Sequence, residues 1–138
     1  MKKEVAKKWV KALRSGKYKQ GQNYLKKFND KGEPRHCCLG VLCELYNDSM
    51  RKSNKKTLDT QTTQVYDLPY TPQEIVTFNG EDTSLPVEVK NWAGISDPLG
   101  LGTFHDVHEE PQCLADLNDM GKRLTTIANI IEKNIENI

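Results

Sequence analysis

The sequence predicts an α+β fold in a single domain, with about five helices around a buried central helix at residues 37–46 and a small antiparallel sheet. A chain of 138 residues is long enough for one core but too short for two independent ones, so residues 1–138 are expected to form one domain. The stretch 37–46 is apolar nearly all round when it is drawn as a helix. The flanking segments show helical periods or short strand-like runs separated by turn signals, a pattern typical of α+β proteins.

Two neighbouring apolar stripes define the central helix. One stripe consists of Cys38, Val41, Leu42 and Leu45, and the other of Leu39, Leu42, Cys43 and Tyr46. A helix with two such stripes belongs in the middle of a domain, because almost none of its surface suits water. Gly40 lowers the helix propensity, so we expect another backbone to pack closely against it.

The N-terminal part of the chain begins with an amphipathic helix, expected at residues 2–15 and ended by Gly16. Its inward side carries Val5, Ala6, Trp9, Val10 and Leu13. A short strand is expected near residues 24–28. The turn signal at residues 29–32 then sends the chain back toward the central helix.

The middle of the chain is polar. Residues 47–64 contain few apolar side chains, and we expect an exposed, flexible loop there. Short strands are expected at residues 65–68 and 75–78, and Asn79-Gly80 after the second is a tight-turn signal. A last strand, expected at residues 103–107, completes the antiparallel sheet with the earlier ones.

Prolines and glycines mark the ends of the later helices. Pro86 opens a helix that Gly94 closes, and Pro111 opens another. The final helix follows the helical period with Leu124, Ile127, Ala128, Ile131 and Ile135. Ile130 and Ile138 lie off this stripe, so the final helix has either a partner surface or a wider core face.

The net charge of +1 conceals two regions of opposite sign. Residues 1–27 carry ten lysines and arginines against Glu4, a net charge of +9. Residues 67–119 carry eleven acids against Lys90, a net charge of −10. Such a chain folds its halves against each other, attracts its own copies, or presents a basic face to an anion. Solvated surfaces of opposite sign that partly neutralise each other also fit the pattern.

The cysteines and the hydropathy bear on the compartment. Three of the four cysteines, Cys37, Cys38 and Cys43, fall on one predicted buried helix, where they cannot staple distant loops, so reduced thiols are expected. No apolar run approaches the length of a membrane span, and the basic, polar start does not resemble a signal peptide. We therefore expect a soluble intracellular protein with no membrane partner.

Four ordered motifs connect the chain to known proteins. They are Trp9–Gln20, Cys37–Cys43, Leu85-Pro86 with Trp92-Ala93-Gly94, and Leu117–Gly121 with Ile127–Glu132. Together they resemble a widespread family of small bacteriophage proteins that usually carry no assigned function. The resemblance covers most of the chain except residues 47–64, and it implies a phage or prophage origin and expression in the cytoplasm of an infected bacterium. Small phage proteins in that setting often act on the host. His36 stands where these proteins often carry an aromatic residue, so its role is inferred from its own chemistry.

The cysteines and histidines suggest two kinds of site, a thiol nucleophile and a zinc site. A thiol nucleophile needs a cysteine with a lowered pKa and a histidine base, and Cys37 follows His36 directly. The side chains of two adjacent residues at the start of a helix point in different directions, however. We therefore favour the interpretation that these cysteines are buried for structural reasons. A zinc site built from His36, Cys37, Cys43 and the pair His105 and His108 lacks the paired C-x-x-C spacing of strong zinc motifs.

Acids and histidines also alternate in one stretch, formed by His105, Asp106, His108, Glu109 and Glu110. Such a set can hold a metal or transfer protons in phosphoester chemistry. A solvated segment that leads into the start of a helix, where acids are favoured, is the commoner arrangement. Gly100-Leu101-Gly102 lacks the third glycine of a dinucleotide fingerprint, no Walker loop is present, and no cofactor is expected.

The most informative polar stretch lies at the end of the first helix. Arg14, Lys17, Tyr18 and Gln20 place a guanidinium, an ammonium, an aromatic ring and an amide within a few residues. Arg and Lys bind phosphate oxygens, Tyr stacks on a base and Gln meets base edges, while His36 is a further donor to phosphate. The charge of −10 elsewhere disfavours a nucleic-acid backbone, so a compact nucleotide-type ligand fits these residues better.

Three function hypotheses follow. The first is a non-enzymatic phage anti-defence protein that binds and sequesters a nucleotide-type immune signal, such as a cyclic nucleotide or an ADP-ribose derivative. A dimer joined through opposite-charge faces or the final helix would help to enclose the ligand, and residues 47–64 could act as a lid. The alternative is a phage regulatory protein that binds a host protein or DNA through the basic N-terminal helix. The third is a phosphodiesterase-like hydrolase of such a signal, dependent on His105 and His108.

Overall fold

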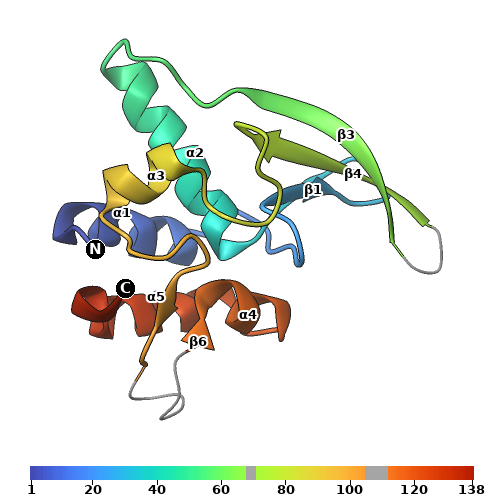
Figure 1. Ribbon diagram of the computed structural model, residues 1–138. Helices are drawn as coiled ribbons and strands as arrows, with labels where there is room; N and C mark the ends of the chain where they lie inside the picture. Colours follow the sequence, from blue (N-terminus) through green and yellow to red (C-terminus); the bar gives the residue numbers. More distant parts are fainter. Residues whose placement is uncertain (68–70, 105–111) are drawn as a thin grey trace.

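The computed structural model describes residues 1–67, 71–104 and 112–138 and confirms the α+β fold class. The helices are α1 (Lys3–Arg14), α2 (Cys38–Lys52), α3 (Val87–Ala93), α4 (Leu114–Asp119), α5 (Leu124–Lys133) and the short 3₁₀ helix η1 (Ile135–Asn137). The strands are β1 (Lys26–Phe28), β2 (Pro34–His36), β3 (Thr60–Asp67), β4 (Thr71–Phe78), β5 (Leu101–Gly102) and β6 (Gln112–Cys113). The helices gather on one side of the molecule, and the β3–β4 ribbon extends from the other (Figure 1).

The first half of α2 occupies the centre, as the sequence predicts. Every residue from Cys38 to Cys43 is buried. A Cβ added to Gly40 would overlap the carbonyl oxygen of Leu25, so the expected close backbone neighbour is the segment that precedes β1. The indole Nε1 of Trp9 on α1 donates a hydrogen bond to the carbonyl oxygen of Cys38 over 2.9 Å. The helix is thus held by both apolar packing and a buried polar contact.

Asn118 on α4 connects this centre to the segment after α1. Its Oδ1 accepts from the backbone N–H of Cys38 at 3.2 Å and from Nε2 of Gln20 at 3.0 Å. Its Nδ2 donates to the carbonyl oxygen of Gly21 at 2.8 Å. A fully buried amide with partners on both of its polar atoms fixes three parts of the chain together, because leaving any of these groups unpaired would be costly.

The main sheet has four strands in the order β2-β1-β4-β3, and all named pairs are antiparallel. Its fourth member is Pro34–His36, a three-residue strand that is not expected from the sequence. The strand predicted at residues 103–107 is wrong for 103 and 104, and residues 105–107 lie outside the described part of the chain. Leu101–Gly102 pairs instead with Gln112–Cys113 in a separate two-stranded sheet, and Gly102 packs closely against the carbonyl oxygen of Asn137 rather than against the main sheet.

The predicted loop at residues 47–64 is largely regular structure. Helix α2 continues to Lys52, and β3 begins at Thr60, which leaves only a short connection between them. The second half of α2 is polar because it faces water, and Asn47 within it accepts from the N–H of Leu58 at 2.8 Å. Strand β3 is polar because both of its faces are largely exposed, and its backbone is held by an uninterrupted register with β4.

The C-terminal helix has the wider core face that was one of the two expected alternatives. Ile130 is only 6% exposed and Ile138 only 4%. Helix α5 packs along α1, and the two chain ends lie near each other (Figure 1). No helix in the described segments is both long and apolar enough to cross a membrane.

Candidate functional site

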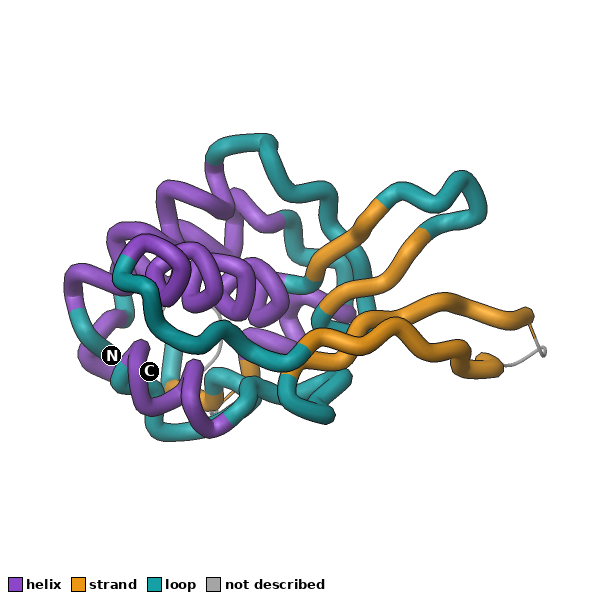
Figure 2. Tube along the Cα trace, turned by 90° about the horizontal axis from the view of Figure 1, so that it is seen from above, coloured by secondary structure: helices purple, strands orange, loops and turns teal. Residues whose placement is uncertain are grey.

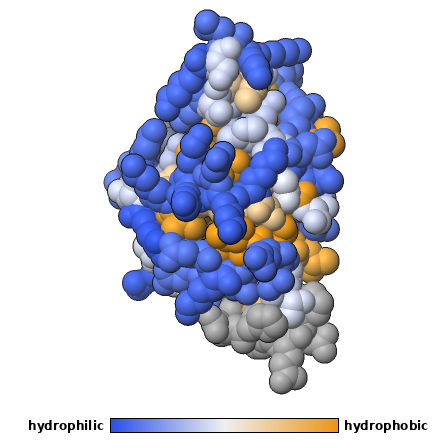
Figure 3. All heavy atoms as spheres, turned by 90° about the vertical axis from the view of Figure 1, so that its left-hand side faces the viewer, coloured by the Kyte–Doolittle hydropathy of each residue, from blue (hydrophilic) through white to orange (hydrophobic). Residues whose placement is uncertain are grey.

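Helix α1 has a groove on each side. One groove lies between α1 and α5, and the other between α1 and the second half of α2. The face that carries the chain ends is mainly hydrophilic, and apolar side chains show through across its middle (Figure 3). The chemistry of the two grooves differs because their charged residues have different partners.

We call the groove between α1 and α2 the lysine groove. It has a volume of about 530 Å³. Its lining consists of Lys8, Lys11, Ala12, Ser15, Lys17, Tyr18, Leu45, Asp48, Ser49, Lys52 and Ser53. The volume lies within the range of small-molecule sites, which is about 300–1,000 Å³. The helical period explains the lining, since Lys8, Lys11 and Ser15 recur on one side of α1 and Asp48 and Lys52 are one turn apart on α2.

The lysine groove is electrostatically positive. Four of its lining residues are lysines, and none of them forms an ion pair with another residue in the described segments. Its one lining acid is Asp48, whose carboxylate is paired with Arg51 at 2.9 Å. Four ammonium groups beside an acid that is already paired favour an anionic ligand.

Tyr18 reaches this groove because the segment after α1 runs along β2. The backbone N–H of His36 donates to the carbonyl oxygen of Lys19 at 2.9 Å, and the N–H of Gly21 donates to that of His36 at 2.8 Å. The rings of Tyr18 and His36 meet edge to face, with centroids 5.1 Å apart. The Nζ of Lys17 lies 5.4 Å from the centre of the Tyr18 ring. Lys17 and Tyr18 therefore form one polar and aromatic corner of the groove.

The protonation states of this corner follow from burial. Burial raises the pKa of the Tyr18 hydroxyl, and the carboxylates of Asp48 and Glu44 raise it further, so this hydroxyl is a donor at neutral pH. Burial lowers the pKa of His36 to about 4, and the charge of Lys26 acts in the same direction. Its Nε2 lies 4.0 Å from Glu44 Oε1 and has no hydrogen-bond partner within the described segments. His36 is thus a neutral ring behind Tyr18 rather than a cation.

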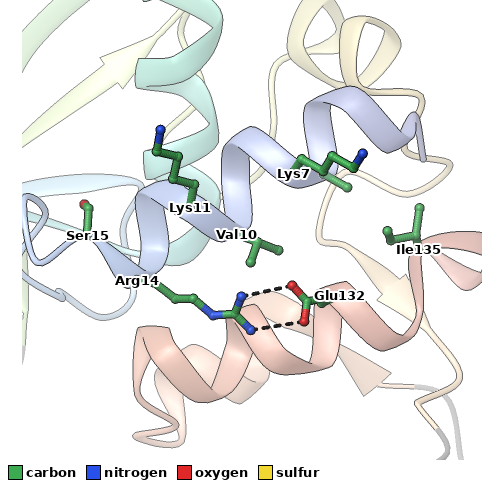
Figure 4. Close-up of a pocket in the computed structure, with 8 residues that line it drawn as sticks. Lys7, Val10, Lys11, Arg14, Ser15, Glu132 and Ile135 are labelled. Atoms are coloured by element: carbon green, nitrogen blue, oxygen red, sulfur yellow. Dashed lines mark hydrogen bonds and ion pairs between the residues drawn. The ribbon is translucent and has the colours of Figure 1, made fainter.

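The groove between α1 and α5 has apolar side chains of Ala6, Val10 and Ile135 along it. Arg14 crosses it and is bonded to Glu132, with distances of 2.9 and 3.4 Å to the two carboxylate oxygens (Figure 4). The same guanidinium donates to Asn129 Oδ1 at 2.7 Å. These contacts lower the pKa of Glu132, through the hydrogen bond first and the charge of Arg14 second. Arg14, which the sequence predicts to bind a ligand, is therefore already bonded to two side chains of α5.

The five residues predicted to bind a ligand are divided in the structure. Lys17 and Tyr18 line the lysine groove, and His36 lies directly behind Tyr18. Gln20 faces away from that groove, and its Nε2 donates to Asn118 and to the carbonyl oxygen of Lys122 at 2.7 Å. Arg14 faces α5, as described above. The structure thus brings together three of the five.

Sequence reasoning missed Lys8, Lys11 and Lys52 as groove residues. The first two are three residues apart on a helix that was predicted, so their common face was available as a signal. Lys52 falls within the stretch whose polar composition predicts a loop, and no local pattern indicates that it lies beside α1. Its position depends on the extension of α2 beyond residue 46.

The surroundings of Cys37, Cys38 and Cys43 favour a structural role over a nucleophilic one. Cys37 caps α2 by accepting from the N–H of Gly40 at 3.4 Å, and burial raises its pKa to about 11. Burial likewise raises the pKa of Cys38 and Cys43, so these thiols remain protonated. The described segments contain no group of three potential metal ligands. The histidine and acid stretch at residues 105–110 lies outside the described segments.

Comparison with protein families shows which family the chain resembles over most of its length. A family model described as "Domain of unknown function (DUF8296)" matches residues 1–135. Searches of curated proteins and of solved structures gave no match.

Proposed function

The chain belongs to the DUF8296 family, and we propose that it binds a small nucleotide-type signal in the lysine groove and sequesters it without turnover. In the setting implied by the sequence resemblance, the signal is made by a host defence system, and the protein acts in the cytoplasm of an infected bacterium. The ligand class is a cyclic nucleotide or an ADP-ribose derivative.

One observation carries this proposal. Side chains from three separate parts of the chain converge on one groove: Lys8 and Lys11 from α1, Lys17 and Tyr18 from the segment after it, and Lys52 from α2. Lysine ammonium groups bind phosphate as mobile point charges, and a tyrosine ring offers a base a stacking surface. Ser15, Ser49 and Ser53 add hydroxyl groups for the sugar or phosphate oxygens.

The Lys17 and Tyr18 pair supplies a specific binding step. The ammonium of Lys17 lies over the ring, a weak cation–π contact at an exposed position. A phosphate in the groove would draw this ammonium toward itself, because a phosphate attracts it more strongly than a ring does. The ring would then be free to contact the base, with His36 supporting it from behind.

The absence of turnover is proposed from the chemistry of the groove lining. Proton transfer at neutral pH needs a group whose pKa lies near 7. The lining contains lysines, hydroxyl groups and the paired carboxylate of Asp48, while the pKa of Tyr18 is raised and that of His36 is lowered to about 4. The competing hydrolase hypothesis rests on His105 and His108, so the test must follow the fate of the ligand.

The experiment is a thermal-shift screen against cyclic dinucleotides, cyclic oligonucleotides and ADP-ribose derivatives, followed by chromatography of the recovered ligand. At a ligand concentration of 100 times Kd, the free energy of unfolding should rise by about 2.7 kcal/mol. A shift with one class and intact ligand supports sequestration. Recovery of a chemically altered ligand would support the hydrolase hypothesis instead of sequestration. If no ligand raised the melting temperature, the proposal would be contradicted for these ligands.

A second candidate is supported by the outer surface of α1. Lys3, Lys7, Lys8 and Lys11 are all exposed on this one helix, which would suit DNA or an acidic host protein. Salt distinguishes the two candidates. Binding to DNA should weaken steeply between 50 and 200 mM salt, by about 10³-fold or more if many phosphates are contacted, whereas a ligand enclosed in the groove should lose much less affinity.

A further inference from the structure

The two edges of the main sheet differ sharply. Strand β2 is only three residues long and begins with Pro34. Its outer side is covered by the segment after α1, through a bridge between Gln20 and His36. Strand β3, at the other edge, is eight residues long, and no described segment pairs with its outer side. Proteins usually blunt a long edge strand with charge, proline, a bulge or a covering segment.

Over residues 60–66, β3 carries none of these devices. From Thr60 to Tyr66 the sequence is Thr-Gln-Thr-Thr-Gln-Val-Tyr, without a charged residue or a proline. Its register with β4 runs without interruption from Thr60 opposite Phe78 to Asp67 opposite Thr71, so no bulge bends it away. Residues 60–64 are exposed, and Tyr66 is 67% exposed.

The direction of the free backbone groups can be read from the ladder. The N–H of Asn79 donates to the carbonyl oxygen of Asp59 at 2.7 Å, which makes this a hydrogen-bonded pair in the same register. Hydrogen-bonded and non-hydrogen-bonded pairs alternate along an antiparallel ladder. The odd-numbered residues of β3 therefore bond to β4. Thr60, Thr62, Gln64 and Tyr66 direct their N–H and C=O groups outward.

The outer part of the β3–β4 ribbon also lacks support from the rest of the sheet. Strand β1 pairs with β4 only at Ile75 and Val76. Within the described segments no further strand pairs with β4 beyond these residues, and the ribbon projects away from the helices (Figure 2). An isolated two-stranded ribbon is marginally stable in water, and a further strand would stabilise it.

We propose that β3 is a dimer interface, at which it pairs antiparallel with β3 of a second copy of this chain. The result is an eight-stranded sheet with the order β2-β1-β4-β3 in one copy, followed by β3-β4-β1-β2 in the other. Its two ends are then the short, covered β2 strands, and no long free edge remains.

A second copy is the occupant that the charges favour. In a two-fold pairing every side chain of β3 meets another side chain of the same strand, so a charged edge would face its own charge. The uncharged sequence from Thr60 to Tyr66 confines this repulsion to the acids on either side of it, Asp59 just before the strand and Asp67 at its end. The alternative surface expected from sequence, the final helix, has its apolar residues Ile130 and Ile138 buried within the monomer. This interface does not involve the lysine groove, so the two proposals stand independently.

The test is the oligomeric state of the full chain and of matched variants, measured by light scattering and sedimentation over a range of concentrations. Two copies of β3 can pair in more than one register. In any two-fold register that uses at least three of the four residues with outward N–H and C=O groups, both Thr62 and Gln64 form part of the interface. Gln64→Pro and Thr62→Pro each remove one outward N–H without removing a bond to β4. We expect a wild-type dimer, and a dissociation constant at least about tenfold higher in either proline variant, since each change acts in both copies.

The controls separate the backbone from the side chain and from folding. Gln64→Ala and Thr62→Ala keep the N–H groups and should remain dimeric. Gln64→Lys keeps the backbone bonds but brings like charges together, and it should weaken the dimer even if a proline variant misfolds by circular dichroism. A dimer through opposite-charge faces would dissociate at high salt, whereas a β3 dimer should persist. A monomeric wild type, larger open-ended assemblies, or a dimer unaffected by both the proline and lysine variants would overturn the proposal.

Discussion

The two halves of α2 lie in opposite environments. Between Cys38 and Cys43 the helix is enclosed on all sides, with Leu25 against Gly40 and Trp9 bonded to the Cys38 carbonyl. From Asp48 to Lys52 the same helix borders the lysine groove and meets water. The N-terminal half of this helix therefore forms part of the core, and its C-terminal half forms part of a candidate binding surface.

The first half of α2 should therefore matter mainly for stability, and the second half mainly for ligand binding. Substitutions in the first half should change the free energy of unfolding, because the enclosed segment has no room to adjust. Substitutions in the second half should change the charge of the groove and leave the fold intact, because exposed positions rarely contribute more than about 0.5 kcal/mol. Each prediction below tests one side of this division.

The largest expected effect is that of Gly40→Ala. The added methyl group would overlap the backbone of Leu25, which cannot rotate away as a side chain could. We expect a loss of about 3 kcal/mol in the free energy of unfolding, the upper end of the usual cost of overpacking. Urea unfolding followed by circular dichroism measures it. Ser49→Ala, on the second half of the same helix, is the matched control and should change stability by less than about 0.5 kcal/mol.

The opposite result for Gly40→Ala would be informative. Where nothing packs against a helical glycine, alanine stabilises the helix by about 0.5–1 kcal/mol. A more stable variant would therefore show that the segment before β1 does not touch α2 at this position.

The second effect is a loss of stability on acidification, caused by His36 beside the middle of α2. Its pKa is about 4 in the folded protein, below its ordinary value of 6.5, so between these values the unfolded chain binds a proton that the folded chain does not. The contribution is complete above pH 6.5 and is lost as the pH falls to 4. It amounts to about 3 kcal/mol by linkage.

The measurement is urea unfolding of wild type and His36→Phe at pH 7 and pH 4.5. Phenylalanine keeps a ring against Tyr18 but has no proton to bind, so the variant should lose less stability on acidification than the wild type. Protonation of carboxylates lowers the stability of both proteins by the same amount. The difference between their losses of unfolding free energy therefore reports the contribution of His36 alone. Equal losses of stability in the two proteins would mean that folding does not lower the pKa of His36.

The third effect concerns ligand affinity. Lys17→Glu and Lys52→Glu each reverse a charge in the lysine groove, and each should lower the affinity for a phosphorylated ligand by about 10–100-fold, the range for a lost charge-assisted bond. Isothermal titration measures the affinity. Lys55→Glu and Lys56→Glu are controls with the same charge change at exposed residues that do not line the groove. If all four variants lost affinity equally, general electrostatic attraction rather than the groove would explain binding.

The smallest effect is expected for Arg14→Ala. Its ion pair with Glu132 joins side chains that are 40% and 58% exposed, and such solvent-exposed pairs contribute little to stability. Arg14 lies outside the lysine groove, so ligand affinity should change less than about twofold. A tenfold loss of affinity would instead place the ligand in the groove between α1 and α5, against the division proposed above.

Periodicity made the core predictable. The apolar stripes placed α1, α5 and the start of α2 because burial requires matching apolar faces, and Gly40 indicated a close backbone neighbour that the structure identifies as Leu25. The loop predicted at residues 47–64 from polar composition was wrong for most of its length. Polar side chains indicate exposure, but helices and strands can both be exposed, and the β3 ladder depends on backbone bonds to distant β4.

The candidate site was predictable only where it is local. Lys17 and Tyr18 are adjacent in sequence and lie together in the groove. Arg14 and Gln20 are almost as close in sequence, but tertiary contacts with Glu132 and Asn118 occupy them. Lys52 enters the groove from more than thirty residues away, and local composition carries no information about such a partner.

The burial of three thiols in α2 and at its N-cap makes it possible to detect local opening of the core. Cys37, Cys38 and Cys43 are enclosed and protonated, whereas Cys113 is partly exposed. A thiol-specific reagent should modify Cys113 from the folded state and reach the other three only when the surroundings of α2 open. The rates of their modification, followed by mass spectrometry in the unaltered chain, would report how often the centre of this molecule admits solvent.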